Sequence, residues 1–254
     1  MKQNHIAQRL NGIFFIIVLV AFSSCSDSDD GESFEDSGAG AISGQVFLHD
    51  PFGIPTDNEG MTIRLVGHGS TATSEVNGAY VFTSAPLGTY EMIFEKDGFG
   101  TFITEVEHTR SFERGSTTVL AYYLGEKSST FVGGSGATSM ANDRLQVQLS
   151  TLPTGTATGP IYLSVFLGRD ANITNQSNLG VIGPLRINTG FSNVSLEIAI
   201  AQVQDLGFTS GETVHFKIYG DSFQTNAYEG DNGTVHPNAN DRTNQFVSGS
   251  FVLP

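Results

Sequence analysis

Apolar and polar residues alternate along many short stretches of this chain, which is the period of a strand with one buried face. Turn residues separate these stretches, and the pair Asn77-Gly78 favours a tight hairpin. Apolar positions at helical spacing are almost absent. The pattern predicts an all-β protein, and in the first half its strands are expected at residues 42–48, 61–66, 71–76, 80–82, 90–94, 99–106 and 117–124.

A second set of alternating stretches follows after residue 128, so two consecutive β-sandwich domains are expected, over residues 41–124 and 128–254. Together the two ranges hold roughly 200 residues, which is enough for two domains of about 100 residues each. Residues 199–206 are expected to form a helical turn at a corner of the second sandwich. Its strands are expected at residues 145–149, 161–167, 194–200, 214–219 and 246–253.

The turns of the first sandwich carry a recognisable set of motifs. Residues 75–82 read Glu-Val-Asn-Gly-Ala-Tyr-Val-Phe, residues 86–90 read Pro-Leu-Gly-Thr-Tyr, and residues 97–99 read Asp-Gly-Phe. In this combination the segment resembles the carboxypeptidase regulatory-like domain, a transthyretin-like sandwich of seven strands. The resemblance covers about a third of the chain. It implies a non-catalytic accessory or spacer module and supplies no active-site residues.

The second sandwich is loosely similar to fibronectin type III and immunoglobulin-like domains. The passage from Leu206 through Gly211 to Tyr219 carries this similarity. The tryptophan that is typical of fibronectin type III is missing, since the chain contains no Trp. The resemblance implies an immunoglobulin-like sandwich in the broad sense.

Residues 1–24 have the order of charge, apolar residues and small residues that is typical of a secretory signal. The apolar run over residues 13–22 is shorter than the roughly 20 residues of a membrane-spanning helix. Residues 22–25 resemble the lipobox of bacterial lipoproteins, with Phe22 in place of the usual leucine. The resemblance implies that Cys25, the only cysteine, carries a diacylglyceryl group and an N-acyl chain such as palmitate. An ordinary secretion signal with a coincidental cysteine is the alternative.

Residues 25–40 are polar, acidic and rich in glycine, so they are expected to form an extended tether after the lipid anchor. Acidic residues directly after the lipidated cysteine resemble the surface-export signal of lipoproteins in the Bacteroidetes. This resemblance implies an outer-membrane lipoprotein that is exposed at the cell surface. A plain solvated linker is the alternative.

The charge balance limits the choice of partners. The full chain has a net charge of −14, and the leader holds two of its twelve basic residues and none of its acidic ones. The mature chain therefore carries 10 basic and 26 acidic residues, a net charge of −16. Such a surface disfavours nucleic acid and direct contact with anionic lipid. The expected partners are the membrane, through the lipid anchor, and a glycan or a protein.

No catalytic or metal-binding motif stands out in the sequence. The histidines do not occur at H-E-x-x-H spacing, there is no G-x-S-x-G, and no lysine follows the glycines of residues 133–136. The only cysteine is assigned to lipidation. We therefore expect no enzymatic activity, no cofactor and no metal centre. An enzyme with a pair of carboxylates distant in sequence remains as an alternative.

One connection stands out by its length, with about 25 residues between the strand that ends at Tyr219 and the one that starts near Gln245. Function concentrates on such loops when a rigid scaffold holds them. Its carboxylates suit Ca²⁺, and its aromatic side chains suit a sugar ring or a peptide. We predict that this loop contacts a ligand, with a mobile acidic loop as the alternative. The candidate residues are Asp221, Phe223, Tyr228, Glu229, Asp231, His236 and Asp241.

Taken together, these features favour a non-catalytic cell-surface lipoprotein that acts as a binding or interaction module in glycan uptake or adhesion. The alternative interpretation of the same features is a structural spacer or an assembly subunit of an envelope complex.

Overall fold

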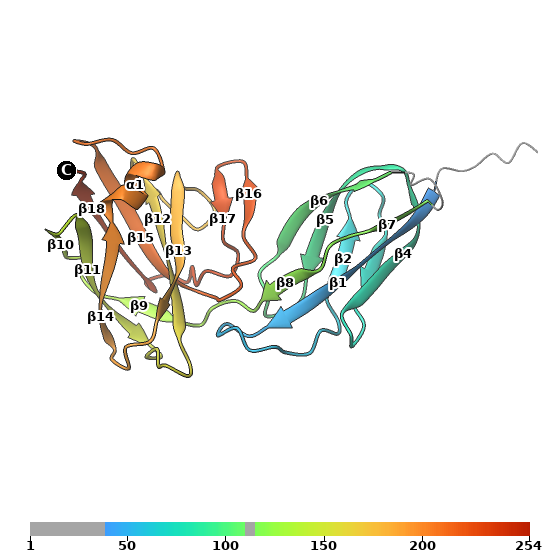
Figure 1. The fold of residues 1–254 in the computed structure, drawn as a ribbon, viewed down its shortest axis with the longest axis horizontal. Coiled ribbons are helices and arrows are strands. Elements are labelled where there is room, and N and C mark those ends of the chain that lie inside the picture. Colours follow the sequence, from blue (N-terminus) through green and yellow to red (C-terminus); the bar gives the residue numbers. More distant parts are fainter. Residues whose placement is uncertain (1–38, 110–114) are drawn as a thin grey trace, which may run out of the picture. The chain divides into compact units, whose positions relative to one another are not determined.

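The computed structural model of the protein describes residues 39–109 and 115–254 (Figure 1). The expected signal peptide, Cys25 and all but the last two residues of the predicted tether lie outside these residues. The described residues belong to one compact unit whose regular secondary structure is strand apart from one short helix, which confirms the all-β prediction. Within this part of the chain, no helix has the length and apolar character needed to cross a membrane.

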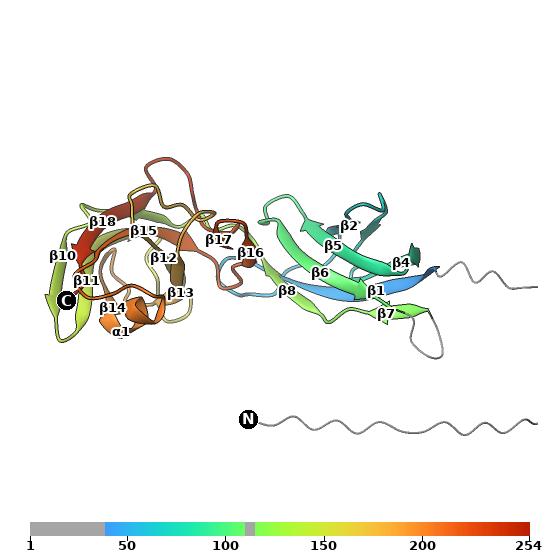
Figure 2. The same cartoon turned by 90° about the horizontal axis from the view of Figure 1, so that it is seen from above.

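Two four-stranded sheets form the first sandwich. One has the order β4-β1-β7, with β8 also paired to β1, and the other has the order β3-β2-β5-β6. Figure 2 shows β5 and β6 in one layer and β1 and β7 in the other. The strands are β1 (Ala39–His49), β2 (Thr62–Leu65), β3 (Thr71–Thr73), β4 (Ala79–Pro86), β5 (Gly88–Glu95), β6 (Phe102–His108), β7 (Ser116–Thr118) and β8 (Tyr122–Gly125).

The strand expected at residues 71–76 ends at Thr73, the one expected at residues 80–82 runs on to Pro86, and the first and last strands also differ from the expected ones. β1 begins at Ala39, so residues 39 and 40 of the predicted tether belong to the sheet, where Gly40 pairs with Ala85. The single strand expected over residues 117–124 is divided into β7 and β8, which both run parallel to β1.

The motif residues of the first sandwich build its core. Tyr80 and Phe82 of β4 point inward, and the ring of Tyr80 meets that of Phe94 edge-on at 5.9 Å between centroids. The Asn77-Gly78 turn requires its glycine, because Gly78 has a φ of +82° and a Cβ there would overlap the carbonyl oxygen of Val46. The pattern that carries the family resemblance therefore has a physical origin in packing and turn geometry.

The second sandwich pairs a sheet of order β13-β12-β15-β18 with a sheet of order β10-β11-β14, in which β9 also pairs with β11. A six-residue helix follows β14 and confirms the expected helical turn. The elements are β9 (Phe131–Gly133), β10 (Thr138–Ala141), β11 (Arg144–Leu152), β12 (Ile161–Gly168), β13 (Gly180–Ile187), β14 (Asn193–Ala199), α1 (Ile200–Asp205), β15 (Thr213–Asp221) and β18 (Phe246–Val252).

Each sandwich has its own hydrophobic core, one made by residues between 42 and 124 and the other by residues between 132 and 253. In the second sandwich, β12 is buried at all eight of its positions. Its outer face is covered because Phe166 packs with Tyr219 and with two residues from connections, Ile173 and Ala239. Two long connections therefore lie on the outer face of this sheet and are held there by apolar contacts.

The connection between β15 and β18 is ordered, in contrast to the structureless loop that the sequence predicted. It contains a two-stranded hairpin, formed by β16 (Tyr228–Gly230) and β17 (Gly233–Val235). Ala239 and the side chains that flank it are buried. The alternating pattern gave no indication of this hairpin because each of its strands is only three residues long.

Candidate functional site

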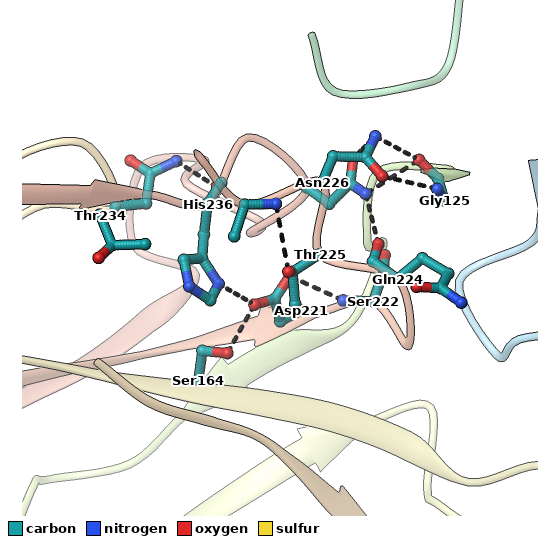
Figure 3. A network of polar contacts seen from close by, with 12 residues as sticks. Gly125, Ser164, Asp221, Ser222, Gln224, Thr225, Asn226, Thr234 and His236 are labelled. Atoms are coloured by element: carbon teal, nitrogen blue, oxygen red, sulfur yellow. Dashed lines mark hydrogen bonds and ion pairs between the residues drawn. The ribbon is translucent and has the colours of Figure 1, made fainter. Parts of the chain in front are cut away.

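The predicted ligand loop has a buried part, and Asp221 and His236 belong to it. The Asp221 Oδ2 atom accepts a hydrogen bond from the Ser164 hydroxyl at 2.5 Å and lies 2.9 Å from Nδ1 of His236 (Figure 3). The Oδ1 atom accepts the backbone N–H of Ser222 at 2.8 Å. Asp221 and His236 are therefore buried groups that bond to their neighbours, and contact of either with a ligand stays a prediction from the sequence.

The trio of Ser164, Asp221 and His236 does not activate a nucleophile. Asp221 stands between the other two, so the serine hydroxyl donates to the carboxylate and not to the imidazole. A catalytic serine needs the imidazole next to its hydroxyl, to take up the proton. Ser164 is also fully buried. The arrangement satisfies buried polar groups, as a closed hydrogen-bond network does.

Two buried asparagines of the same loop bind the backbone of the first sandwich. Asn226 donates from Nδ2 to the Gly100 carbonyl at 2.9 Å and accepts the Gly125 N–H on Oδ1 at 2.7 Å. Asn238 accepts the Gly100 N–H on Oδ1 at 2.8 Å and donates from Nδ2 to the Gly125 carbonyl at 2.9 Å. Each side-chain amide thus offers a donor and an acceptor, as a strand backbone would. We call these four residues the joint.

The joint depends on close approach of the backbones. A Cβ on Gly125 would overlap the Gln224 carbonyl oxygen, and a Cβ on Gly100 would lie 2.5 Å from Oδ1 of Asn238. Beside the joint, Phe52 from the connection after β1 packs against the core of the second sandwich. This part of the predicted loop therefore contacts the first sandwich through its asparagine side chains.

Two further candidate residues, Phe223 and Asp241, do not line either of the two hollows that the hairpin borders. Phe223 is 45% exposed, and its ring centroid is 5.5 Å from that of Tyr162. Asp241 is exposed after the buried Asn240. Burial, and to a smaller extent the charge of Asp241, raise the pKa of Tyr219 to about 12.

Tyr228 and Glu229 of the hairpin line an acidic groove of about 430 Å³ against β5 and β6. Glu91 and Glu105 stand directly opposite each other on these two strands and share the groove. Burial and the charge of Glu91 both raise the pKa of the Tyr228 hydroxyl. Like charges in opposite positions are mildly destabilising in a sheet. This groove brings together two of the predicted residues with carboxylates that sequence reasoning had not connected to them.

The turn of the hairpin lines a second hollow, a cavity of about 560 Å³ at one end of the second sandwich. We call it the end cavity. Its other wall is the connection between β12 and β13, far away in sequence. Asp231 is the only predicted residue in it. Its lining consists of Gly168, Arg169, Asp170, Asn172, Ile173, Ser177, Asn178, Leu179, Asp231, Asn232 and Gly233.

Hydrogen bonds from Asn178 to two backbone carbonyl groups hold the two walls of the end cavity together. The Asn178 N–H donates to the Asn232 carbonyl at 3.0 Å, and Asn178 Nδ2 donates to the Thr234 carbonyl at 2.9 Å. On the first wall, Oδ1 of Asp170 accepts the N–H of Asn172 at 2.7 Å and shapes the turn. Ile173 anchors the same wall in the apolar cluster of the outer face. The polar side chains of the cavity are thus held by a fixed scaffold.

Asn178 has one unused hydrogen-bonding atom. The residue is only 8% exposed, and its Oδ1 accepts no hydrogen bond. Buried acceptors without a donor are uncommon in proteins. Residues 39–109 and 115–254 contain no group of three or more His, Cys, Asp or Glu side chains arranged to hold a metal. Binding of Ca²⁺ at the hairpin stays a prediction from the sequence.

No protein-family model matches this chain, and no curated protein matches it. A candidate carbohydrate-binding protein from Bacteroides uniformis is similar at 17% identity over 84% of this chain and 99% of its own, with a TM-score of 0.30. A DUF3823 family protein from Bacteroides ovatus is similar at 11% identity over 85% of this chain and 100% of its own, with a TM-score of 0.29.

A third solved structure, a cohesin–X-dockerin complex from Acetivibrio cellulolyticus, is similar at 17% identity with a TM-score of 0.28. That alignment covers 34% of this chain and 56% of the other chain, so this chain spans about half of its length. The fold and the site define an all-β protein of two sandwiches with a polar cavity at the end of the second. Its function is inferred below from the chemistry of that cavity.

Proposed function

We propose that this protein is a non-catalytic binding lipoprotein of the cell envelope, which holds a glycan in the end cavity. The observation that carries the proposal is the convergence of hydrogen-bonding side chains from two loops, with Asp170 and Asn172 on one and Asp231 and Asn232 on the other. Carboxylates accept hydrogen bonds from sugar hydroxyls, and amides both donate and accept. Leu179, 51% exposed, adds an apolar contact for the C–H face of a sugar.

The size and stiffness of the end cavity support the same proposal. Its volume of about 560 Å³ lies within the range of roughly 300–1,000 Å³ that is usual for small-ligand sites. The contacts of Asn178 to Asn232 and Thr234 fix the walls before a ligand arrives. A fixed site loses less conformational entropy on binding than a mobile loop does.

The proposal is tested by substituting Asp231, which lines the end cavity on the side of the hairpin. Asp231→Ala is expected to weaken glycan binding about tenfold, because an acceptor for sugar hydroxyls is lost from the site. Asp241→Ala is the matched control, since Asp241 is an exposed aspartate of the same connection outside the lining. Binding is measured on an array of neutral and acidic oligosaccharides and then by calorimetry, in Ca²⁺ and in EDTA.

Two outcomes would contradict the proposal: binding to no glycan on the array, or equal binding by the parent and the Asp231→Ala variant. Binding that occurs in Ca²⁺ and is lost in EDTA would instead support the prediction from the sequence that the loop binds Ca²⁺.

A second function, that of a spacer or assembly subunit, is favoured by the joint. Asn226 and Asn238 tie the backbone of the first sandwich to the second, as an element of fixed geometry requires. In this role, the carboxypeptidase regulatory-like sandwich would separate the lipid anchor from the binding module along the chain. The two functions are compatible within one protein.

The lipid anchor is supported by the sequence of the leader and by the single cysteine. We expect that Cys25→Ala abolishes association with the outer membrane, because no acyl chain can then be attached and two or more chains are needed for stable anchoring. The measurement is the share of protein in the membrane fraction after a wash in high salt. Cys25→Ala protein that remains in that fraction would refute the anchor.

A further inference from the structure

The cationic residue in the lining of the end cavity, Arg169, has its charge compensated by a neighbour. Its Nε donates to the Glu212 carboxylate at 3.1 Å, and Nη2 donates to the Gly207 carbonyl at 3.1 Å. Its guanidinium also lies over the ring of Phe208, 5.2 Å from the centroid. These three contacts fix the half-exposed Arg169 side chain beside Glu212, so the pair together adds no net charge to the lining.

Glu212 remains ionised as the partner of Arg169. The pKa of its carboxyl group is lowered by the hydrogen bond from the Thr209 N–H and by the one from Arg169. The compensation of the Arg169 charge therefore persists at neutral pH and somewhat below it.

The two carboxylates of the end cavity have no such compensation. Within the part of the chain that the structure describes, neither Asp170 nor Asp231 forms an ion pair. Both residues are exposed in the lining. Their charges add to the strongly negative charge of the chain, so the cavity repels anions.

The hydrogen-bonding atoms of the two carboxylates also favour an uncharged ligand over an anion. The carboxylates of Asp170 and Asp231 are acceptors only. Acceptors need donors from the ligand. A sugar hydroxyl supplies a donor, whereas a sugar carboxylate at neutral pH supplies only acceptors.

We propose that the end cavity takes uncharged sugar residues and excludes carboxylated ones. This inference rests on the proposed glycan-binding function and adds the class of sugar to it. The net negative charge of the cavity comes from Asp170 and Asp231, because Arg169 is paired with Glu212. This charge repels the carboxylate of an acidic sugar. Amino sugars, which carry a positive charge, are tolerated by the same site.

The test compares sugars that differ only at C6. The methyl glycosides of glucose and galactose are titrated against those of glucuronic and galacturonic acid, and affinities are obtained from amide shifts in NMR spectra of the full mature chain. We expect the neutral member of each pair to bind at least about tenfold more tightly, the effect of one or two uncompensated charges near a surface. Pairs of oligosaccharides with the same difference serve where single residues bind too weakly.

The double substitution Asp170→Asn and Asp231→Asn is expected to remove this preference, raising the affinity for the acidic member about tenfold. Asp241→Asn, which removes an equal charge outside the lining, is expected to leave the preference unchanged. Equal affinity of the parent protein for both members would overturn the inference and leave glycan binding intact. Absence of binding to every sugar would overturn the proposed function and this inference together.

Discussion

Asp221→Ala is expected to lower the free energy of unfolding by about 3 kcal/mol, because two buried donors, of Ser164 and His236, lose their common acceptor. The side chain of Asp221 is almost completely buried, so water does not readily take its place. The loss is measured by urea unfolding, followed by far-ultraviolet circular dichroism because the chain has no tryptophan.

Asp241→Ala serves as the control for this substitution. It removes the same type of side chain from an exposed position of the same connection and is expected to change stability by less than about 0.5 kcal/mol. If Asp221→Ala is as stable as Asp241→Ala, the buried network of Figure 3 does not exist in solution.

Asn238→Ala is expected to uncouple the two sandwiches. The substitution leaves the Gly100 N–H without its acceptor and the Gly125 carbonyl with Asn226 as its remaining side-chain donor, at a cost of about 2 kcal/mol. Because the sandwiches have separate cores, we expect a single thermal transition in the parent to become two in the variant. Differential scanning calorimetry measures this directly.

An independent substitution separates steric from hydrogen-bonding effects at the joint. Gly125→Ala keeps every side-chain amide but puts a Cβ against the Gln224 carbonyl oxygen, so it is expected to act like Asn238→Ala. Gly115→Ala is the control, since the nearest atom to its Cβ is 3.6 Å away. One unchanged transition in both Asn238→Ala and Gly125→Ala would show that the joint does not couple the sandwiches.

Alternation predicted β11, a strand with one buried face and one more exposed face. In β11, Leu145, Val147 and Leu149 are buried, as their spacing indicates. β13 went unrecognised because Gly183 and Pro184 interrupt its alternation, and proline is usually confined to edge strands. β13 is such an edge strand.

The sequence did not show which residues of the connection between β15 and β18 are buried and which are exposed. Asn226 and Asn238 have side chains that are equally suited to water and to a buried backbone, so their residue type does not reveal their burial. Asp231 was found because it lies in the connection that attracted attention by its length. Asp170 and Asn172 were missed although the sequence predicted no strand over residues 168–193, a stretch of about the same length, and only the fold brings them to the hairpin.

The central claim is that ligand contact belongs to the end cavity and that the rest of the predicted loop is structural. The most direct measurement is a map of amide shift changes in the NMR spectrum of the isotope-labelled mature chain on titration with a neutral oligosaccharide. We predict that the largest changes fall in residues 168–179 and 231–233, with Gly100 and Gly125 unaffected. Changes that cluster at the joint or on the first sandwich, with none in the end cavity, would contradict the account.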